Sequence, residues 1–207
     1  MARKTKEEAE QTRLSIMGSA LDTFCDLGYS KTTFDEIAKR IGLTKGAVYW
    51  HFNNKPEIIT SIITEAFDRV NEAVAKEVPH ILTIGDLRKS LTYHAKFIEE
   101  NNIYRKFLFF IMFQMEWSET FYSRVKETIQ YICDYSERQI INALKASQKS
   151  GEISKDIDIN KISVIINSLW DGLLHNEIKD REGNKNFSEM VGYSFDLIIN
   201  SIKTKRS

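Results

Sequence analysis

The sequence contains few of the residues that cross-link a chain or turn it sharply. Its 207 residues include two cysteines, two prolines and nine glycines. Cys25 and Cys133 lie far apart and in no metal-ligand spacing, which argues against a disulfide framework and favours reduced thiols in a cytoplasmic protein. The scarcity of proline and glycine argues against a fold with many hairpin turns. We therefore expect a mainly helical chain.

Long hydrophobic runs and net charge are also absent. The longest apolar run covers residues 107–113, far short of the ~20 residues that cross a bilayer, so no membrane partner is expected. The 29 basic residues balance the 29 acidic residues. This balance excludes a uniformly basic nucleic-acid-binding protein, but it does not exclude a local basic patch.

The sequence lacks the short motifs of common enzymes. It has no P-loop, no GxGxxG, no HExxH and no GxSxG, and its four histidines are scattered without metal-ligand spacing. We therefore expect no enzymatic activity, no cofactor and no metal site.

Apolar residues recur at helical spacing along most of the chain, and the alternation typical of strands does not persist. Thr5 with Glu8, and Thr33 with Glu36, have the form of capping boxes at helix starts. The expected helices cover approximately residues 6–27, 34–41, 45–52, 56–76, 86–100, 103–117, 121–150, 160–176 and 187–203. The fold class is therefore all-α, with three small N-terminal helices, a connecting helix and a larger helical body.

Two of these helices, 34–41 and 45–52, are too short to bury much surface alone. In a helix-turn-helix unit the helices meet near a right angle, which requires a small residue at the crossing, a flexible turn and an apolar residue returning to the core. Ala38, Gly42 and Val48 supply these three at spacings of four and six. The pattern predicts a helix-turn-helix unit, with ordinary core packing of two short helices as the alternative.

The outward side of the second short helix is expected to carry hydrogen-bond donors and aromatic rings and no acid. Its residues are Thr44, Lys45, Gly46, Tyr49 and Trp50, followed by His51 and Lys55. Such side chains suit phosphates and base edges. Residues 31–55 hold five basic and two acidic side chains, which makes this region locally basic. Arg3, Lys4 and Lys6 form a basic arm that either tracks DNA or is a solvated tail.

A long ungapped stretch resembles the N-terminal domain of the TetR family of transcriptional regulators. It reads Thr32-Thr33-x-x-x-Ile37-Ala38-x-x-x-Gly42-Leu43-Thr44-x-Gly46-x-Val48-Tyr49-x-His51-Phe52-x-x-Lys55. The run from Gly46 to Phe52 is most similar to the AcrR type of multidrug-efflux repressor. The resemblance implies a helix-turn-helix DNA-binding domain over residues 1–55 and a helical ligand-binding and dimerisation domain over residues 56–207.

The resemblance also implies a role for each residue of the DNA-binding set. Thr33 would cap the second helix against a phosphate, and Thr44, Lys45 and Gly46 would lie at the start of the recognition helix. Thr44 and Lys45 are the expected base-edge contacts. Tyr49 and His51 would be the phosphate-clamping aromatic pair, and Lys55 the ammonium placed at the start of the fourth helix in the DNA-binding set. Trp50 lies on the same exposed face, and local backbone capping is the alternative role of His51.

The helical body is rich in aromatic and thioether side chains around residues 107–117. Such side chains repack around varied apolar ligands, although core packing alone is the alternative for each one. The family resemblance implies a cavity for a small-molecule effector. Its expected lining residues, by their helices and their chemistry, are Phe67, Phe97, Phe113, Gln114, Trp117 and Trp170.

The last two expected helices are apolar on more than one face. A twofold four-helix interface, which the family also uses, would cover the second face, and burial within one chain is the alternative. Gly172, Ser188 and Gly192 would allow close approach of the two copies. We therefore expect a homodimer formed through these two helices.

These expectations combine into a ligand-responsive repressor that binds a palindromic DNA operator as a homodimer. A small hydrophobic or aromatic effector would release it, and it would control a multidrug efflux pump. The alternatives are a TetR-type regulator of a metabolic or lipid gene that senses another ligand, and a helical protein-interaction module. An intact DNA-facing set argues against the last of these.

Overall fold

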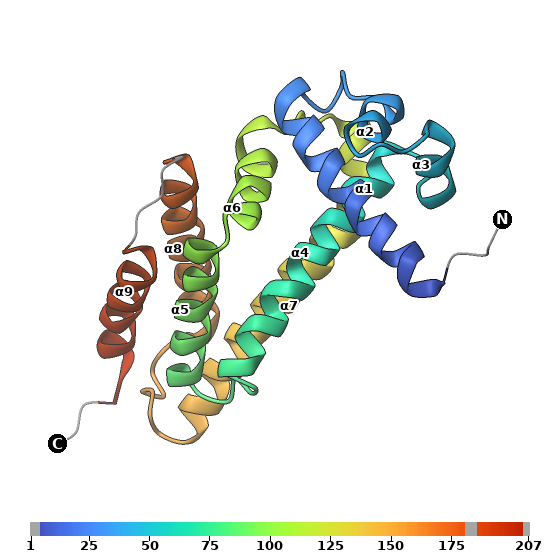
Figure 1. Ribbon diagram of the computed structural model, residues 1–207. Coiled ribbons are helices and arrows are strands. Elements are labelled where there is room, and N and C mark those ends of the chain that lie inside the picture. Colours follow the sequence, from blue (N-terminus) through green and yellow to red (C-terminus); the bar gives the residue numbers. More distant parts are fainter. Residues whose placement is uncertain (1–4, 181–185, 205–207) are drawn as a thin grey trace. The chain divides into compact units, whose positions relative to one another are not determined.

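The chain is described by a computed structural model over residues 5–180 and 186–204, so Arg3 and Lys4 of the basic arm lie outside the described residues. The described part forms nine α-helices and one π-helix and contains no strand (Figure 1). In chain order these are α1 (Lys6–Leu27), α2 (Phe34–Arg40), α3 (Lys45–His51), α4 (Lys55–Glu77), α5 (Ile84–Glu100), α6 (Asn102–Phe109), η1 (Phe110–Gln114), α7 (Glu119–Lys149), α8 (Ile159–Lys179) and α9 (Phe187–Ile202). The all-α prediction is confirmed.

Threonine side chains begin several of these helices. Thr5 and Thr33 form the two predicted capping boxes, each with a glutamate three residues later. Thr83 forms a third box with Asp86, so α5 begins at Ile84 rather than at the predicted residue 86. The aspartate serves as the cap partner within the helix, whereas the sequence pattern suggested that the helix starts there.

Contacts within the chain divide it into two compact units. The first unit comprises Met1–Ala66 and Phe107–Ile129, and the second comprises Phe67–Lys106 and Gln130–Ser207. The first unit therefore contains the first part of α4 and the segment around η1 in addition to α1, α2 and α3. The predicted domain boundary between residues 55 and 56 stays a prediction.

The first unit is built on the predicted helix-turn-helix packing. Ala38 and Val48 are fully buried where α2 and α3 meet. Gly42 lies between them with a φ of 67°, a left-handed conformation that side chains other than glycine rarely adopt. The Leu43 amide donates to the Ala38 carbonyl at 2.9 Å and closes the turn. The three residues that predicted this unit thus have the expected roles.

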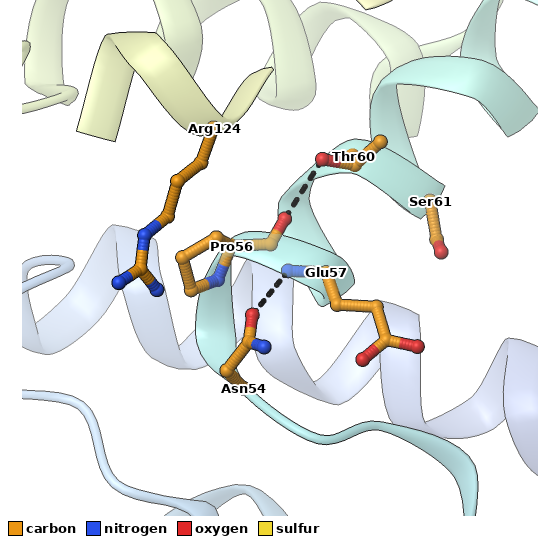
Figure 2. Close-up of a pocket in the computed structure, with 6 residues that line it drawn as sticks. All are labelled: Asn54, Pro56, Glu57, Thr60, Ser61 and Arg124. Atoms are coloured by element: carbon orange, nitrogen blue, oxygen red, sulfur yellow. Dashed lines mark hydrogen bonds between the residues drawn. The ribbon is translucent and has the colours of Figure 1, made fainter. Parts of the chain in front are cut away.

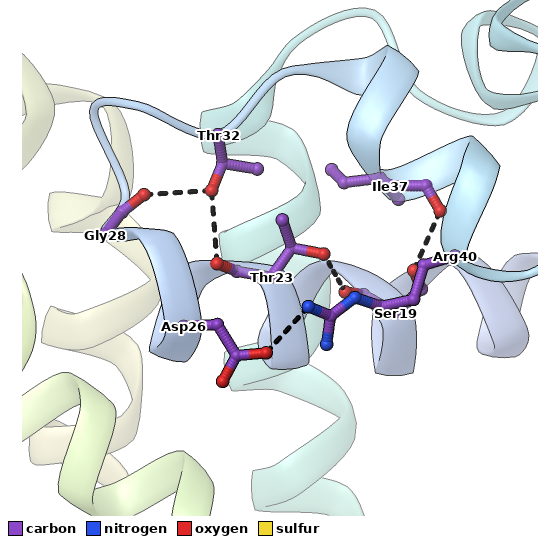
Figure 3. Close-up of polar contacts among 7 residues, drawn as sticks. All are labelled: Ser19, Thr23, Asp26, Gly28, Thr32, Ile37 and Arg40. Carbon is purple, nitrogen blue, oxygen red and sulfur yellow. Dashed lines mark hydrogen bonds and ion pairs between the residues drawn. The ribbon is translucent and has the colours of Figure 1, made fainter.

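Polar side chains fasten α1 to α2 and to the loop between them (Figure 3). The buried Ser19 hydroxyl donates to the Ile37 carbonyl at 2.8 Å. The Thr32 hydroxyl donates to the Gly28 carbonyl at 2.9 Å. On the surface, the Arg40 guanidinium bonds the Asp26 carboxylate at 2.6 Å. The buried Ser19 bond contributes more than the exposed ion pair, because an exposed pair is screened by water.

Replacement of Ser19 by alanine is expected to lower the free energy of unfolding by about 1–2 kcal/mol, because the Ile37 carbonyl then stays buried without this donor. Chemical denaturation followed by circular dichroism measures the change. Ser15→Ala is the matched control: Ser15 is exposed on the same helix, and its loss is expected to cost less than about 0.5 kcal/mol. Equal losses in the two variants would contradict this assignment.

The predicted helix over residues 103–117 is wrong in its second half. The α-helix ends at Phe109 and continues as the π-helix η1, and residues 115–117 are not helical. The Trp117 indole nitrogen instead donates to the Ile111 carbonyl at 3.2 Å. Phe110 is fully buried and stacks on Phe24 of α1, with ring centroids 5.7 Å apart. Tertiary packing of Phe110 on α1 therefore accompanies a break that helical periodicity does not reveal.

In the second unit, α9 packs along α5 and also contacts α8. Arg88 of α5 binds the Asp196 carboxylate through two nitrogens, at 2.5 and 2.6 Å. A Cβ on Gly192 would lie 3.2 Å from the Arg88 guanidinium, and Ser188 bonds the Glu99 carboxylate. Gly192 and Ser188 thus face α5 within one chain, which corrects the prediction that they line an interface between two copies.

Apolar side chains on α8 and α9 remain exposed within the second unit. They are Val164, Ile165, Met190, Tyr193 and Leu197, each about half exposed or more. We call these five residues the α8–α9 face. No helix within the described ranges is long and apolar enough to span a membrane.

Candidate nucleic-acid interface

The short helix α3 presents most of the predicted DNA-binding residues on one side. Val48 and the following Phe52 are buried and hold the helix on the core. Tyr49 is 52% exposed and Trp50 is 72% exposed, unusually high values for aromatic side chains. Thr44, Lys45 and Gly46 are also exposed at the start of the helix. The side chains therefore project from one side of α3, as recognition of a DNA groove requires.

Several contacts fix the geometry of this exposed side. The Thr44 hydroxyl accepts a hydrogen bond from the Ala47 amide at 3.2 Å and caps the helix. The Lys45 ammonium lies 5.7 Å from the centre of the Tyr49 ring, and that ring packs on Phe34 of α2 at 4.7 Å. The half-buried His51 ring meets the Trp50 ring edge-on at 4.5 Å. The side chains are thus partly ordered before any ligand is present, which lowers the entropy cost of binding.

Thr33 occupies the N-cap of α2, as predicted. Its hydroxyl oxygen accepts from the Glu36 amide at 3.3 Å, and its own amide donates to the Glu36 carboxylate at 2.7 Å. The backbone amide is therefore engaged within the helix. The hydroxyl proton remains as the donor that the side chain offers to a phosphate.

Lys55 is engaged inside the first unit rather than extended toward solvent. Its ammonium donates to the carbonyls of Tyr29 at 2.6 Å and Ser30 at 3.1 Å, and it lies 4.7 Å from the centre of the Tyr29 ring. Burial lowers the pKa of Lys55, while the nearby carboxylates of Glu116 and Glu36 act in the opposite direction. Two of its three protons therefore bond to carbonyls, and its predicted role in DNA binding stays a prediction.

The structure adds Tyr29, which sequence reasoning missed, to this region. Its ring meets Phe24 at 5.3 Å and Phe121 of α7 at 5.1 Å. Burial raises the pKa of Tyr29 to about 12, opposed by the charge of Arg124. The sequence gives no signal for this role, because Tyr29 follows Gly28 in a loop and its partners come from distant segments.

A polar pocket of about 400 Å³ lies beside the start of α4 (Figure 2). It is lined by Asn54, Pro56, Glu57, Thr60, Ser61 and Arg124. The Asn54 side chain accepts from the Glu57 amide at 2.9 Å and begins the helix there. Arg124 reaches the pocket from α7. Most of the lining side chains are polar, so this pocket differs from the aromatic cavity expected from the sequence.

Three of the six predicted effector-binding residues belong to the first unit. Phe113 packs on Phe109 at 5.4 Å and is partly exposed, as is Trp117. The side-chain oxygen of Gln114 is buried and has no hydrogen-bond partner within the described residues. A buried oxygen of this kind is costly unless a donor reaches it, so Gln114 can orient a ligand that carries a hydrogen-bond donor.

The other three predicted residues lie in the second unit. Phe67 meets the rings of Tyr131 and Tyr135 at 6.2 and 5.4 Å. Trp170 and Phe97 belong to one aromatic row, in the order Phe97, Tyr104, His94, Trp170 and Phe187, with neighbouring centroids 4.8–6.4 Å apart. That these six residues line one effector cavity stays a prediction.

The polar members of the aromatic row are kept neutral by their surroundings. Burial lowers the pKa of His94 to about 4 and raises that of Tyr104. Near pH 7 the row therefore offers neutral, polarisable surfaces and no charge. In the part of the chain that the structure covers, no three histidine, cysteine or acidic side chains gather closely enough to hold a metal ion.

Comparison with known proteins supports this interpretation of the first unit. Residues 16–62 match the family model described as "Bacterial regulatory proteins, tetR family". The probable HTH-type transcriptional regulator ArpR of Pseudomonas putida is 28% identical over 177 residues, covering 84% of this chain and 83% of ArpR.

Solved structures extend the similarity to the whole fold. SmeT, the repressor of the Stenotrophomonas maltophilia multidrug efflux pump SmeDEF, matches with a TM-score of 0.75 and 21% identity over 95% of this chain and 93% of SmeT. The fatty acid degradation regulator FadR of Bacillus halodurans matches with a TM-score of 0.75 and 15% identity over 99% of this chain and all of FadR. The chain therefore contains a DNA-binding domain of the tetR family of bacterial regulatory proteins over residues 16–62, is related in sequence to transcriptional regulators such as ArpR, and has the fold of SmeT and FadR.

Proposed function

We propose that the protein is a homodimeric repressor that binds a palindromic operator and is released by a small hydrophobic or aromatic effector. The exposed side of α3 carries this proposal, because it presents capped, partly ordered donors and aromatic rings and no acidic side chain. Thr44 and Lys45 contact base edges, and Thr33, Tyr49 and His51 contact phosphates. Gly46 lets the helix approach the groove closely, and Trp50 extends the same surface.

A second copy of the chain covers the α8–α9 face. Five large apolar side chains are exposed on two helices that contact each other, and exposed apolar side chains grouped in this way are typical of protein interfaces. Dimerisation places two copies of α3 on one duplex. Reading a palindrome requires them to be about one DNA turn apart, roughly 34–36 Å, so an effector that alters this spacing weakens binding.

The effector is an uncharged or weakly polar aromatic compound, and the regulated gene encodes a multidrug efflux pump. The neutral aromatic row of the second unit supports this ligand chemistry. Triclosan, the ligand in a solved complex of SmeT, has aromatic rings and a hydroxyl donor. A lipid-responsive regulator is the second candidate, because the structural relatives also include FadR of Bacillus subtilis in complex with stearoyl-CoA.

The function is tested by titrating the protein against the DNA upstream of its own gene at moderate salt, with a scrambled duplex of equal length as control. We expect preferential binding of the upstream duplex, and equal binding of both would overturn the repressor assignment. Triclosan and stearoyl-CoA are then added separately to the complex. Release by triclosan supports an efflux regulator, and release by stearoyl-CoA alone supports the lipid-responsive alternative.

A further inference from the structure

Two side chains from separate helical segments hold the turn formed by Tyr29 and Ser30. Lys55, at the start of α4, donates to both backbone carbonyls of this turn. Glu116, which follows η1, accepts a hydrogen bond from the Ser30 hydroxyl. The Glu116 carboxylate also lies near Gly28, since a Cβ there would be 3.9 Å from it. The Lys55 ammonium and the Glu116 carboxylate therefore both bind the turn that follows α1.

The Tyr29–Ser30 turn is also connected rigidly to the start of α2. Thr32 is buried, and its hydroxyl binds the carbonyls of Gly28 at 2.9 Å and Thr23 at 3.4 Å. The next residue, Thr33, is the N-cap of α2. Ser30 thus lies three residues before the cap, along a backbone segment with little freedom. A shift of the Tyr29–Ser30 turn therefore shifts the end of α2 that the proposed function places against a phosphate.

The segment that carries Glu116 is packed against the same turn by aromatic contacts. Trp117 meets Phe121 at 5.5 Å, and Phe121 meets Tyr29 at 5.1 Å. Phe110, the first residue of the π-helix, stacks on Phe24 of α1. These contacts lie within the first unit and join residues 110–121 to α1 and its turn. A conformational change in this segment therefore reaches the turn through Glu116 and Phe121.

The negative charge of Glu116 allows its effect on the Tyr29–Ser30 turn to be distinguished from its direct electrostatic effect on DNA. A carboxylate on a DNA-binding unit repels phosphates, so an acid with no internal role is expected to weaken DNA binding slightly. Glu116 instead directs its carboxylate at Ser30 and lies near the Lys55 ammonium. Its electrostatic effect on DNA and its effect on the turn therefore have opposite signs.

We infer that Glu116 is a positioning residue for DNA binding, which holds the Tyr29–Ser30 turn and so couples the segment around η1 to the start of α2. This inference rests on the proposed DNA-binding function. It assigns to an acidic side chain outside the helix-turn-helix a favourable contribution to DNA affinity. It also identifies the path by which a ligand near Phe113 and Gln114 would act on the DNA-binding helices.

The test compares Glu116→Ala with Glu119→Ala in fluorescence-anisotropy titrations of the upstream duplex. Glu119 is exposed in the first turn of α7, and its replacement removes the same charge three residues away. We expect Glu116→Ala to weaken binding about three- to tenfold, the range expected for the net loss of one ordinary hydrogen bond at an exposed position. Glu119→Ala is expected to leave binding unchanged or to strengthen it up to about twofold.

Conservative variants separate positioning from a general loss of stability. Glu116→Gln keeps the acceptor for Ser30 and is expected to bind within about twofold of the wild type. Ser30→Ala is expected to match Glu116→Ala within about twofold, the allowance for the lost charge, and the double variant to lose no more than Ser30→Ala, because both replacements remove the same bond. Hydrogen exchange is expected to accelerate at residues 29–33 in Glu116→Ala and to stay unchanged in α3.

Each outcome decides the matter. Equal affinities of Glu116→Ala and Glu119→Ala would overturn the positioning role while leaving the proposed function intact. Additive losses of DNA affinity in the double variant would show that Ser30 and Glu116 do not act through one shared hydrogen bond. Absence of specific binding by the wild-type protein would instead refute the proposed function itself, before any variant is compared.

Discussion

Leu197→Glu is expected to convert the proposed dimer into a monomer and to weaken operator binding by a factor of about one hundred or more. Leu197 is 56% exposed on α9, where it lies on the same side as Met190 and Tyr193. A twofold axis through the α8–α9 face brings the two introduced carboxylates into one apolar interface, where neither has a partner. A monomer then contacts one half-site and loses the gain from two linked contacts.

Analytical ultracentrifugation and anisotropy titration measure the two effects on the same samples. Leu82→Glu is the matched control, since Leu82 is 65% exposed in the loop before α5 and is not one of the residues of the α8–α9 face. It is expected to leave both mass and affinity unchanged. A Leu197→Glu protein that remains dimeric and folded would show that a different surface forms the dimer.

Lys45→Ala is expected to weaken operator binding about ten- to a hundredfold and to reduce the preference for the operator over a scrambled duplex. A well-placed contact to a base edge contributes about 1–3 kcal/mol of discrimination against the wrong base. Without Lys45, the base that it contacts no longer affects binding. Lys45 is exposed at the start of α3, so its replacement removes no buried contact. The loss of preference is therefore attributable to DNA contacts.

Tyr49→Phe supplies the contrast within the same helix. Phenylalanine keeps the ring that packs on Phe34 at 4.7 Å and removes only the hydroxyl, the expected phosphate donor. We expect a loss of about three- to tenfold that is equal for operator and scrambled duplexes, because phosphates carry no base identity. Titration of both duplexes at one salt concentration distinguishes the two variants. Equal loss of preference in both would refute the division into base and phosphate contacts.

Much of the first unit could be predicted because its determinants are local in sequence. The capping boxes of Thr5 and Thr33 each involve residues three positions apart. Gly42 indicates a turn because the turn needs a backbone conformation that few other residues adopt. The exposed side of α3 follows from the burial of Val48 alone, since helical geometry then fixes where the neighbouring residues point.

The less predictable features depend on contacts between distant segments. Lys55 has the sequence position of a DNA-contacting lysine, yet its ammonium binds carbonyls about 25 residues earlier. Gly192 has the size expected at an interface between copies, yet it faces Arg88 of α5. Helical periodicity across residues 103–117 continues through the break after Phe109. In each case the residue type is compatible with two environments, and only tertiary packing determines which of them it occupies.

The three tryptophans of the chain lie at places that the proposed mechanism treats separately. Trp50 projects from α3, Trp117 follows η1, and Trp170 belongs to the aromatic row. Indole emission depends on polarity, quenching and neighbouring rings, so each tryptophan is a spectroscopic reporter for one step. With two of the three replaced by phenylalanine in turn, intrinsic fluorescence can follow DNA contact, the segment around η1 and the helical body separately, without any attached dye.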